Sequence, residues 1–151
     1  MDDTHEGGCH CGAVRYRTTG QPNTAGICHC RYCQTRTGSA FGISVYFDAD
    51  RVEILSGRLT DYSFTTESGR SFTTRFCPIC GTTLFWQIEL FDDAIAVAGG
   101  TFDPPTFWYD IDRDIFTRTK AGFVRLDTRE SHDTAPSHAP VTPDREHLKG
   151  G

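Results

Sequence analysis

The chain has 151 residues, of which 37% are hydrophobic and 23% are charged. This size and composition indicate one folded domain with its own core and exclude a mainly disordered chain. The net charge of −5 disfavours nucleic-acid binding, which usually requires a basic surplus. No apolar run approaches the roughly 20 residues that cross a bilayer, and the polar, acidic residues 1–6 do not resemble a signal peptide. We therefore expect a cytoplasmic protein without membrane or nucleic-acid partners.

The N-terminal quarter of the chain predicts a turn, a strand, a loop and a short helix. Residues 7–12 contain glycines and cysteines typical of a turn, and residues 13–18 alternate like a half-buried strand. Gly20, Pro22 and Asn23 indicate a loop. Residues 31–37 are predicted as a short helix that ends at Gly38, because glycine suits the left-handed C-cap position.

The remainder of the domain has mostly β signals. Period-two patterns or short apolar runs predict strands at residues 41–47, 52–55, 60–66, 71–76, 84–90, 95–98, 115–119 and 122–126. The turns at residues 67–70 and 91–93 predict two hairpins. The aromatic residues of these strands should pack in the core, as should Trp108 and Tyr109. The fold class is therefore mainly β, with small antiparallel sheets and little helix.

The composition changes near residue 129. The last residues contain several prolines and the histidines His132, His138 and His147, with few apolar side chains. Such segments seldom bury enough apolar surface to hold one conformation. We expect a zinc domain over residues 1–128 and a flexible, solvated tail over residues 129–151.

The seven cysteines occur in three motifs: Cys9-x-Cys11, Cys28-x-Cys30-x-x-Cys33 and Cys77-Pro78-Ile79-Cys80. A disulfide framework would leave one thiol unpaired, and a reducing compartment disfavours disulfides. Clustered thiols in that setting indicate metal binding, and zinc in particular takes four ligands in a tetrahedron. A redox pair at Cys77 and Cys80 is an alternative.

The spacing also suggests how the thiols divide. Cys28, Cys30 and Cys33 lie close enough in sequence to reach one ion, which leaves a set of four: Cys9, Cys11, Cys77 and Cys80. Four protein ligands are typical of a structural zinc, and three with an open position are typical of a catalytic zinc. Spacing alone also permits a set made of Cys9, Cys11, Cys28 and Cys30.

Two histidines within the motifs and two arginines in or near the second motif can also take part in binding. His10 and His29 lie between cysteines and can be metal ligands. We favour instead a position beside the ligands, or a side chain exposed to solvent. Arg31 and Arg36 can meet a substrate carboxylate, although solvent-facing side chains are favoured. We expect a dry pocket between residues 28–33 and the aromatic strands.

Three thiolates donate much negative charge, so an ion held by them is a poor activator of water. Such an ion is better suited to hold another thiol as a thiolate, the nucleophilic form of sulfur. The ligand type therefore predicts a sulfur-containing substrate.

With their flanking residues, the motifs are Gly8-Cys9-His10-Cys11-Gly12, Cys28-His29-Cys30-Arg31-Tyr32-Cys33 and Phe76-Cys77-Pro78-Ile79-Cys80-Gly81. In order and spacing they resemble the glutathione-dependent formaldehyde-activating enzyme family, which also includes centromere protein V. The resemblance covers about residues 7–126. Many members carry a histidine and later a tryptophan where residues 114–117 and Phe123 stand here.

The resemblance implies a zinc-stapled β-tent fold and two zinc ions per chain. It implies a structural zinc on Cys9, Cys11, Cys77 and Cys80, and a catalytic zinc on Cys28, Cys30 and Cys33. The implied activity is that of a carbon–sulfur lyase, which reversibly joins formaldehyde to glutathione; the partners would be such a thiol and an aldehyde. A non-catalytic zinc-binding module for a protein partner is the alternative. A sulfoxide reductase would need a free nucleophilic cysteine.

Overall fold

The computed structural model describes residues 3–150 and is mainly β, as the sequence predicts. A three-stranded antiparallel sheet has the order β1-β2-β5, with bounds β1 (Thr4–Gly8), β2 (Arg15–Thr19) and β5 (Val52–Ser56). Within the described residues there is one α-helix, α1 (Arg31–Thr37). None of the helices in this part of the chain is long and apolar enough to cross a membrane.

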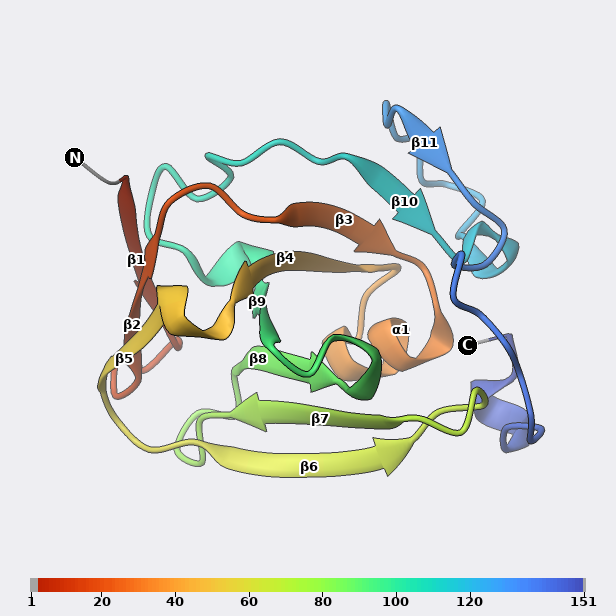
Figure 1. The fold of residues 1–151 in the computed structure, drawn as a ribbon, viewed down its shortest axis with the longest axis horizontal. Helices are drawn as coiled ribbons and strands as arrows, with labels where there is room; N and C mark the ends of the chain where they lie inside the picture. Colours follow the sequence, from red (N-terminus) through yellow and green to blue (C-terminus); the bar gives the residue numbers. More distant parts are fainter. Residues whose placement is uncertain (1–2, 151) are drawn as a thin grey trace.

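The larger sheet has eight strands in the order β11-β10-β3-β4-β9-β8-β7-β6. Their bounds are β3 (Thr24–Cys28), β4 (Gly42–Asp48), β6 (Thr60–Thr65), β7 (Ser71–Phe76), β8 (Thr83–Ile88), β9 (Ala94–Ala98), β10 (Arg113–Ile115) and β11 (Glu130–Ser131). This sheet is mixed, because β10 pairs in parallel with both β3 and β11. Figure 1 shows it extending from β11 to β6, with α1 and the C-terminal segment at one end.

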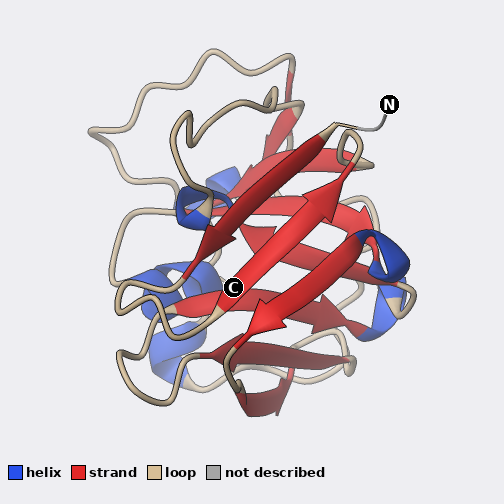
Figure 2. Ribbon diagram, turned by 90° about the vertical axis from the view of Figure 1, so that its left-hand side faces the viewer, coloured by secondary structure: helices blue, strands red, loops and turns tan. Residues whose placement is uncertain are grey.

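The locally encoded elements form as predicted. Helix α1 has the predicted bounds, and Gly38 ends it in the left-handed conformation (φ 65°, ψ 23°). The hairpins β6–β7 and β8–β9 are both antiparallel and lie where the turn residues predict them. Figure 2 shows that strands predominate over helices and that long loops connect them.

Three strands, β1, β3 and β11, have no counterpart in the predictions. Strand β11 lies in the predicted tail, and β1 and β3 contain glycine, which the pattern assigns to turns and loops. The glycines are required by close contacts. A side chain at Gly7 would overlap the Tyr16 hydroxyl, and a Cβ at Gly26 would lie 3.3 Å from the Arg113 carbonyl oxygen. Close backbone approach of this kind is a known reason for glycine within a strand.

The two late strands are predicted wrongly. Residues 115–119 supply only the end of β10 and a 3₁₀ turn, because Phe116 adopts the left-handed conformation (φ 57°) and interrupts the extended chain. Residues 122–126 form no strand, and Phe123 there is 83% exposed.

The core lies between the two sheets and combines aliphatic side chains with large aromatic ones. Tyr16 of β2 meets Phe85 of β8 and Phe102 edge-on, with ring centroids 5.1 and 5.6 Å apart. Tyr109 is buried and donates its hydroxyl to the Gly99 carbonyl oxygen. Trp108 packs against this core and stacks on His5. The prediction of core packing is therefore confirmed for these aromatic residues, but it is wrong for Tyr62 and Phe123, which are 55% and 83% exposed.

The segment beyond residue 128 contacts the domain at several points. Strand β11 pairs with β10. Further along, the Val141 N–H donates to the Glu67 carbonyl oxygen (2.7 Å), and the Tyr32 hydroxyl donates to Asp144 (2.6 Å). Contacts therefore cross the expected boundary between residues 128 and 129, while the flexibility of the segment stays a prediction.

Candidate metal centres and the adjoining pocket

Four sulfur atoms meet between the turn after β1 and the turn after β7. The Sγ atoms of Cys9, Cys11, Cys77 and Cys80 all lie within 4.8 Å of one another. The Cys9–Cys11 and Cys11–Cys77 separations are 3.6 and 3.8 Å. Four sulfurs placed about 2.3 Å from a tetrahedral zinc would be about 3.8 Å apart. The arrangement therefore fits one metal ion with four thiolate ligands.

The two turns also direct hydrogen bonds at the sulfurs. The backbone N–H groups of Val14 and Ile79 donate to Cys9 and Cys77 at 3.2 and 3.4 Å. Bonds from the hydroxyl and the backbone of Thr82 lower the pKa of the Cys80 thiol to about 5. Such donors stabilise thiolates, the form in which cysteine binds metal.

The second cluster consists of Cys28 at the end of β3, Cys30 at the N-cap of α1 and Cys33 in its first turn. All three side chains are buried and their sulfurs lie within 4.8 Å of one another. Hydrogen bonds from Cys28 and Cys30, and the nearby Arg36 guanidinium, lower the pKa of the Cys33 thiol well below its usual value. The hydrogen bonds within the cluster and burial raise the pKa of Cys28 and Cys30 instead. The cluster by itself therefore favours one thiolate, and a bound cation would be needed to hold all three sulfurs as thiolate ligands.

The structure groups the thiols as four and three, not as the alternative set of Cys9, Cys11, Cys28 and Cys30. All seven cysteines lie within the described residues and are free thiols, so no Cys77–Cys80 disulfide is present.

Neither histidine of the motifs joins a cluster. His10 is exposed, whereas His29 is fully buried and its Nε2 lies 2.9 Å from an Asp114 carboxylate oxygen. Asp114 also accepts hydrogen bonds from Thr128 (2.7 Å) and Ser131. This buried pair joins the segment between Cys28 and Cys30 to β10, so His29 positions the three-cysteine cluster rather than completing it.

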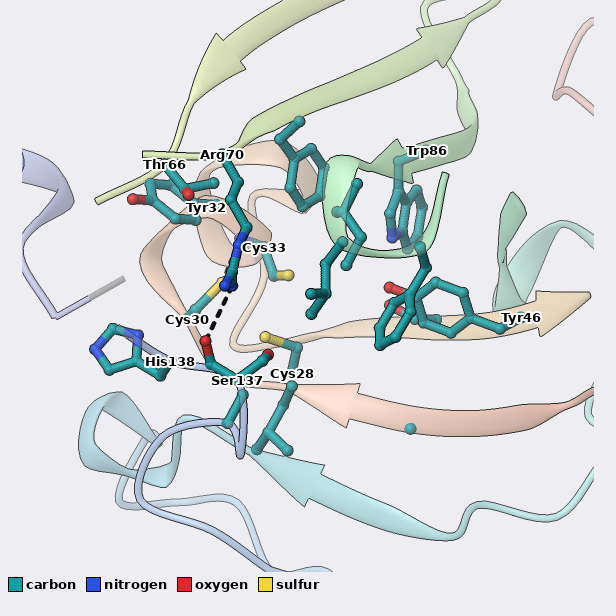
Figure 3. Close-up of a pocket in the computed structure, with 18 of the residues that line it drawn as sticks. Cys28, Cys30, Tyr32, Cys33, Tyr46, Thr66, Arg70, Trp86, Ser137 and His138 are labelled. Carbon is teal, nitrogen blue, oxygen red and sulfur yellow. Dashed lines mark hydrogen bonds between the residues drawn. The ribbon is translucent and has the colours of Figure 1, made fainter. Parts of the chain in front are cut away.

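A pocket of about 630 Å³ opens beside the three-cysteine cluster, where the sequence predicts one. Figure 3 shows Cys28, Cys30 and Cys33 between two groups of side chains. The polar group consists of Tyr32, Thr66, Glu67, Arg70, Ser137 and His138. The apolar group consists of Tyr46, Phe72, Trp86, Ile88, Leu90 and Phe91.

Arg70 is the notable cation of the polar group. Its side chain extends into the pocket beside Cys30 and donates to the Ser137 carbonyl oxygen at 3.0 Å. Within residues 3–150 it forms no ion pair, because the nearby carboxylate of Glu67 is engaged by His138 and Arg118. The guanidinium is therefore available to a ligand carboxylate.

The arginine placed to meet a substrate carboxylate in this pocket is Arg70, whereas the sequence suggests Arg31 and Arg36. Neither Arg31 nor Arg36 lines this pocket. Arg31 bonds to Gln34 and the His147 carbonyl, and Arg36 stacks on Trp86 with its guanidinium 3.7 Å from the ring centroid. The expectation that Arg36 faces solvent is wrong, because it packs between Trp86 and Cys33.

Comparisons with known proteins agree with this site. The family model described as glutathione-dependent formaldehyde-activating enzyme matches residues 4–119. A Halomonas elongata protein provisionally given that same name is 33% identical over 134 residues, which cover 83% of this chain and 82% of the relative. A crystal structure of a Rhodobacter sphaeroides protein shares the fold, with a TM-score of 0.54 and 24% identity over 70% of this chain and 96% of that one.

Replacing Cys77 with alanine should prevent stable folding, because a structural metal contributes directly to folding free energy. Such contributions rival the whole stability of a domain, about 5–15 kcal/mol. Thermal unfolding and metal content would measure the effect. Ile79→Ala is the matched control, since Ile79 lies in the same turn and is 75% exposed. Normal melting and full metal content in Cys77→Ala would contradict the four-cysteine assignment.

Deleting residues 134–151 should change the melting temperature by only a few degrees, because the contacts that this segment makes are mainly polar. The deletion should open the pocket, whose wall includes residues 135–138. A chelator should then remove metal faster from the three-cysteine site while the initial metal content is unchanged. Loss of folded protein would contradict the small predicted change in melting temperature, and an unchanged extraction rate would show that this segment does not act as a wall.

Proposed function

This chain belongs to the glutathione-dependent formaldehyde-activating enzyme family, and we propose that it is a zinc-dependent carbon–sulfur lyase. It would reversibly join an aldehyde to a glutathione-like thiol at the three-cysteine cluster. The observation that carries this proposal is the contact of that cluster, and not the four-cysteine cluster, with the pocket. A closed four-ligand set suits a structural role, and a three-ligand set beside a cavity suits catalysis.

Cys28, Cys30 and Cys33 would hold the catalytic zinc, and Cys9, Cys11, Cys77 and Cys80 would hold the structural one. A zinc with three thiolate ligands supplies a position at which a substrate thiol is kept as a thiolate. The chain's own residues would bind the rest of the substrate. Arg70 would form a charged hydrogen-bonded pair with a carboxylate of the thiol.

The reaction forms one sulfur–carbon bond and moves one proton: the thiol releases its proton to solvent on becoming a thiolate, and the carbonyl oxygen takes one from a donor that solvent reprotonates. The substrate sulfur attacks the aldehyde carbon, a carbon–sulfur bond forms, and the electron pair of the carbonyl π bond moves to oxygen, which takes a proton. Tyr46 is a candidate donor, because its hydroxyl-bearing ring lines the pocket across from the cysteines (Figure 3). Burial raises the pKa of Tyr46, which keeps the hydroxyl protonated and able to donate.

Substitution of zinc by cobalt tests this function. Glutathione should shift the sulfur-to-metal charge-transfer bands, because a thiol is a natural fourth ligand for a thiolate-rich ion. Ophthalmate, in which a methyl group replaces the thiol of glutathione, is the control and should leave the bands unchanged.

The variant Cys30→Ser should lose about one ion per chain and the response to glutathione, while the fold persists. Serine suits this position because the Cys30 side chain caps α1 by accepting from the Cys33 N–H, and serine is a good N-cap. If no small thiol alters the wild-type spectrum and no aldehyde–thiol turnover is found, the lyase proposal fails. A non-catalytic zinc-binding module for a protein partner would then be the better account.

A further inference from the structure

The pocket has an apolar end that is larger than a formaldehyde adduct needs. Figure 3 places Arg70, Tyr32 and His138 on one side of the cysteines and Tyr46 and Trp86 on the other. A hydroxymethyl group adds only one carbon and one oxygen to the substrate sulfur, and both ends of glutathione are polar. Neither part of such an adduct would cover the apolar end.

The apolar end is open to solvent. Leu90 and Phe91, which follow β8, are 37% and 44% exposed and both line the pocket. The Phe91 ring lies edge-on to Tyr46, with centroids 6.0 Å apart. Phe72 and Ile88 are only half-buried beside them. Covering apolar surface of this kind is favourable, so a ligand with its own apolar group would bind here.

Charge determines which part of the adduct lies at each end. Asp48 and Asp93 are both exposed and line the pocket; they lie two residues after Tyr46 and Phe91, respectively. Arg70 and Arg113 both line the pocket as well. Arg70 lies at the end opposite Tyr46, so a carboxylate of the thiol that pairs with Arg70 avoids repulsion by Asp48 and Asp93. The thiol therefore extends towards Arg70, and the substituent of the aldehyde extends towards Phe91.

Resting on the proposed function, we infer that the natural carbonyl substrate is an aldehyde with a bulky apolar substituent, aryl or branched alkyl, rather than formaldehyde. The addition is the same: a sulfur–carbon bond forms, the carbonyl oxygen takes the electron pair and a proton, and no oxidant or reductant takes part. Tyr46, Trp86 and Phe91 would contact the substituent.

Two stable thioethers of glutathione distinguish binding at the apolar end from binding at the rest of the site. S-methylglutathione imitates a formaldehyde adduct, and S-benzylglutathione imitates an adduct of an aryl aldehyde. Isothermal titration of the zinc-loaded protein should give a dissociation constant at least about tenfold lower for the benzyl compound, as expected when an aromatic ring is buried.

The variant Phe91→Ala should bring the two dissociation constants to within about threefold, because it removes apolar contact surface for the ring. Phe123→Ala is the matched control: Phe123 is 83% exposed and does not line the pocket, so the wild-type ratio should persist.

Equal affinities for the two thioethers in the wild-type protein, or no binding of either, would overturn the inference, as would a wild-type ratio in Phe91→Ala. The proposed function is judged separately, by the cobalt response to glutathione itself. A cobalt response together with equal thioether affinities would leave the lyase proposal standing, with formaldehyde or another small aldehyde as its substrate.

Discussion

The meeting of four cysteine sulfurs is the feature around which the two sheets are arranged. Four sulfurs within 4.8 Å of one another cannot all be ionised unless a cation lies among them. Cys9 comes from the turn that leaves the small sheet and Cys77 from a turn of the large sheet, and both belong to the core cluster. An ion at this point would therefore join the two sheets where their aromatic side chains also meet.

The same junction sets the position of the pocket. Strand β7 begins directly after Arg70 at the pocket and ends directly before Cys77 at the four-cysteine cluster. On the opposite side, β3 ends at Cys28, and the buried His29–Asp114 pair joins the next residue to β10. Different interactions therefore fix the two walls of the pocket. A candidate metal centre lies at the end of one wall, and the buried hydrogen bond between His29 and Asp114 lies at the other.

Features encoded by neighbouring residues were predictable from the sequence. The helix at residues 31–37 and both hairpins depend on cap and turn residues. Spacing left two divisions of the cysteines open, and the family resemblance favoured the one that the structure has. Features that depend on contacts between residues far apart in the chain were not predictable from the sequence. Strand β3 contains Gly26 because β10 packs closely on it, and Arg70 reaches the cysteines only because the β6–β7 turn folds over α1 and the C-terminal segment. Asp114 likewise gains its role from a partner far along the chain.

A crystal structure with anomalous diffraction at the zinc edge would test the central claim, that the chain holds one closed and one open zinc. The account predicts two anomalous peaks per chain, one among Cys9, Cys11, Cys77 and Cys80 and the other among Cys28, Cys30 and Cys33. At the second peak the fourth ligand should be a solvent molecule or a small thiol that faces the pocket. A single peak, or a second ion whose fourth ligand is a protein side chain such as His29, would contradict the account.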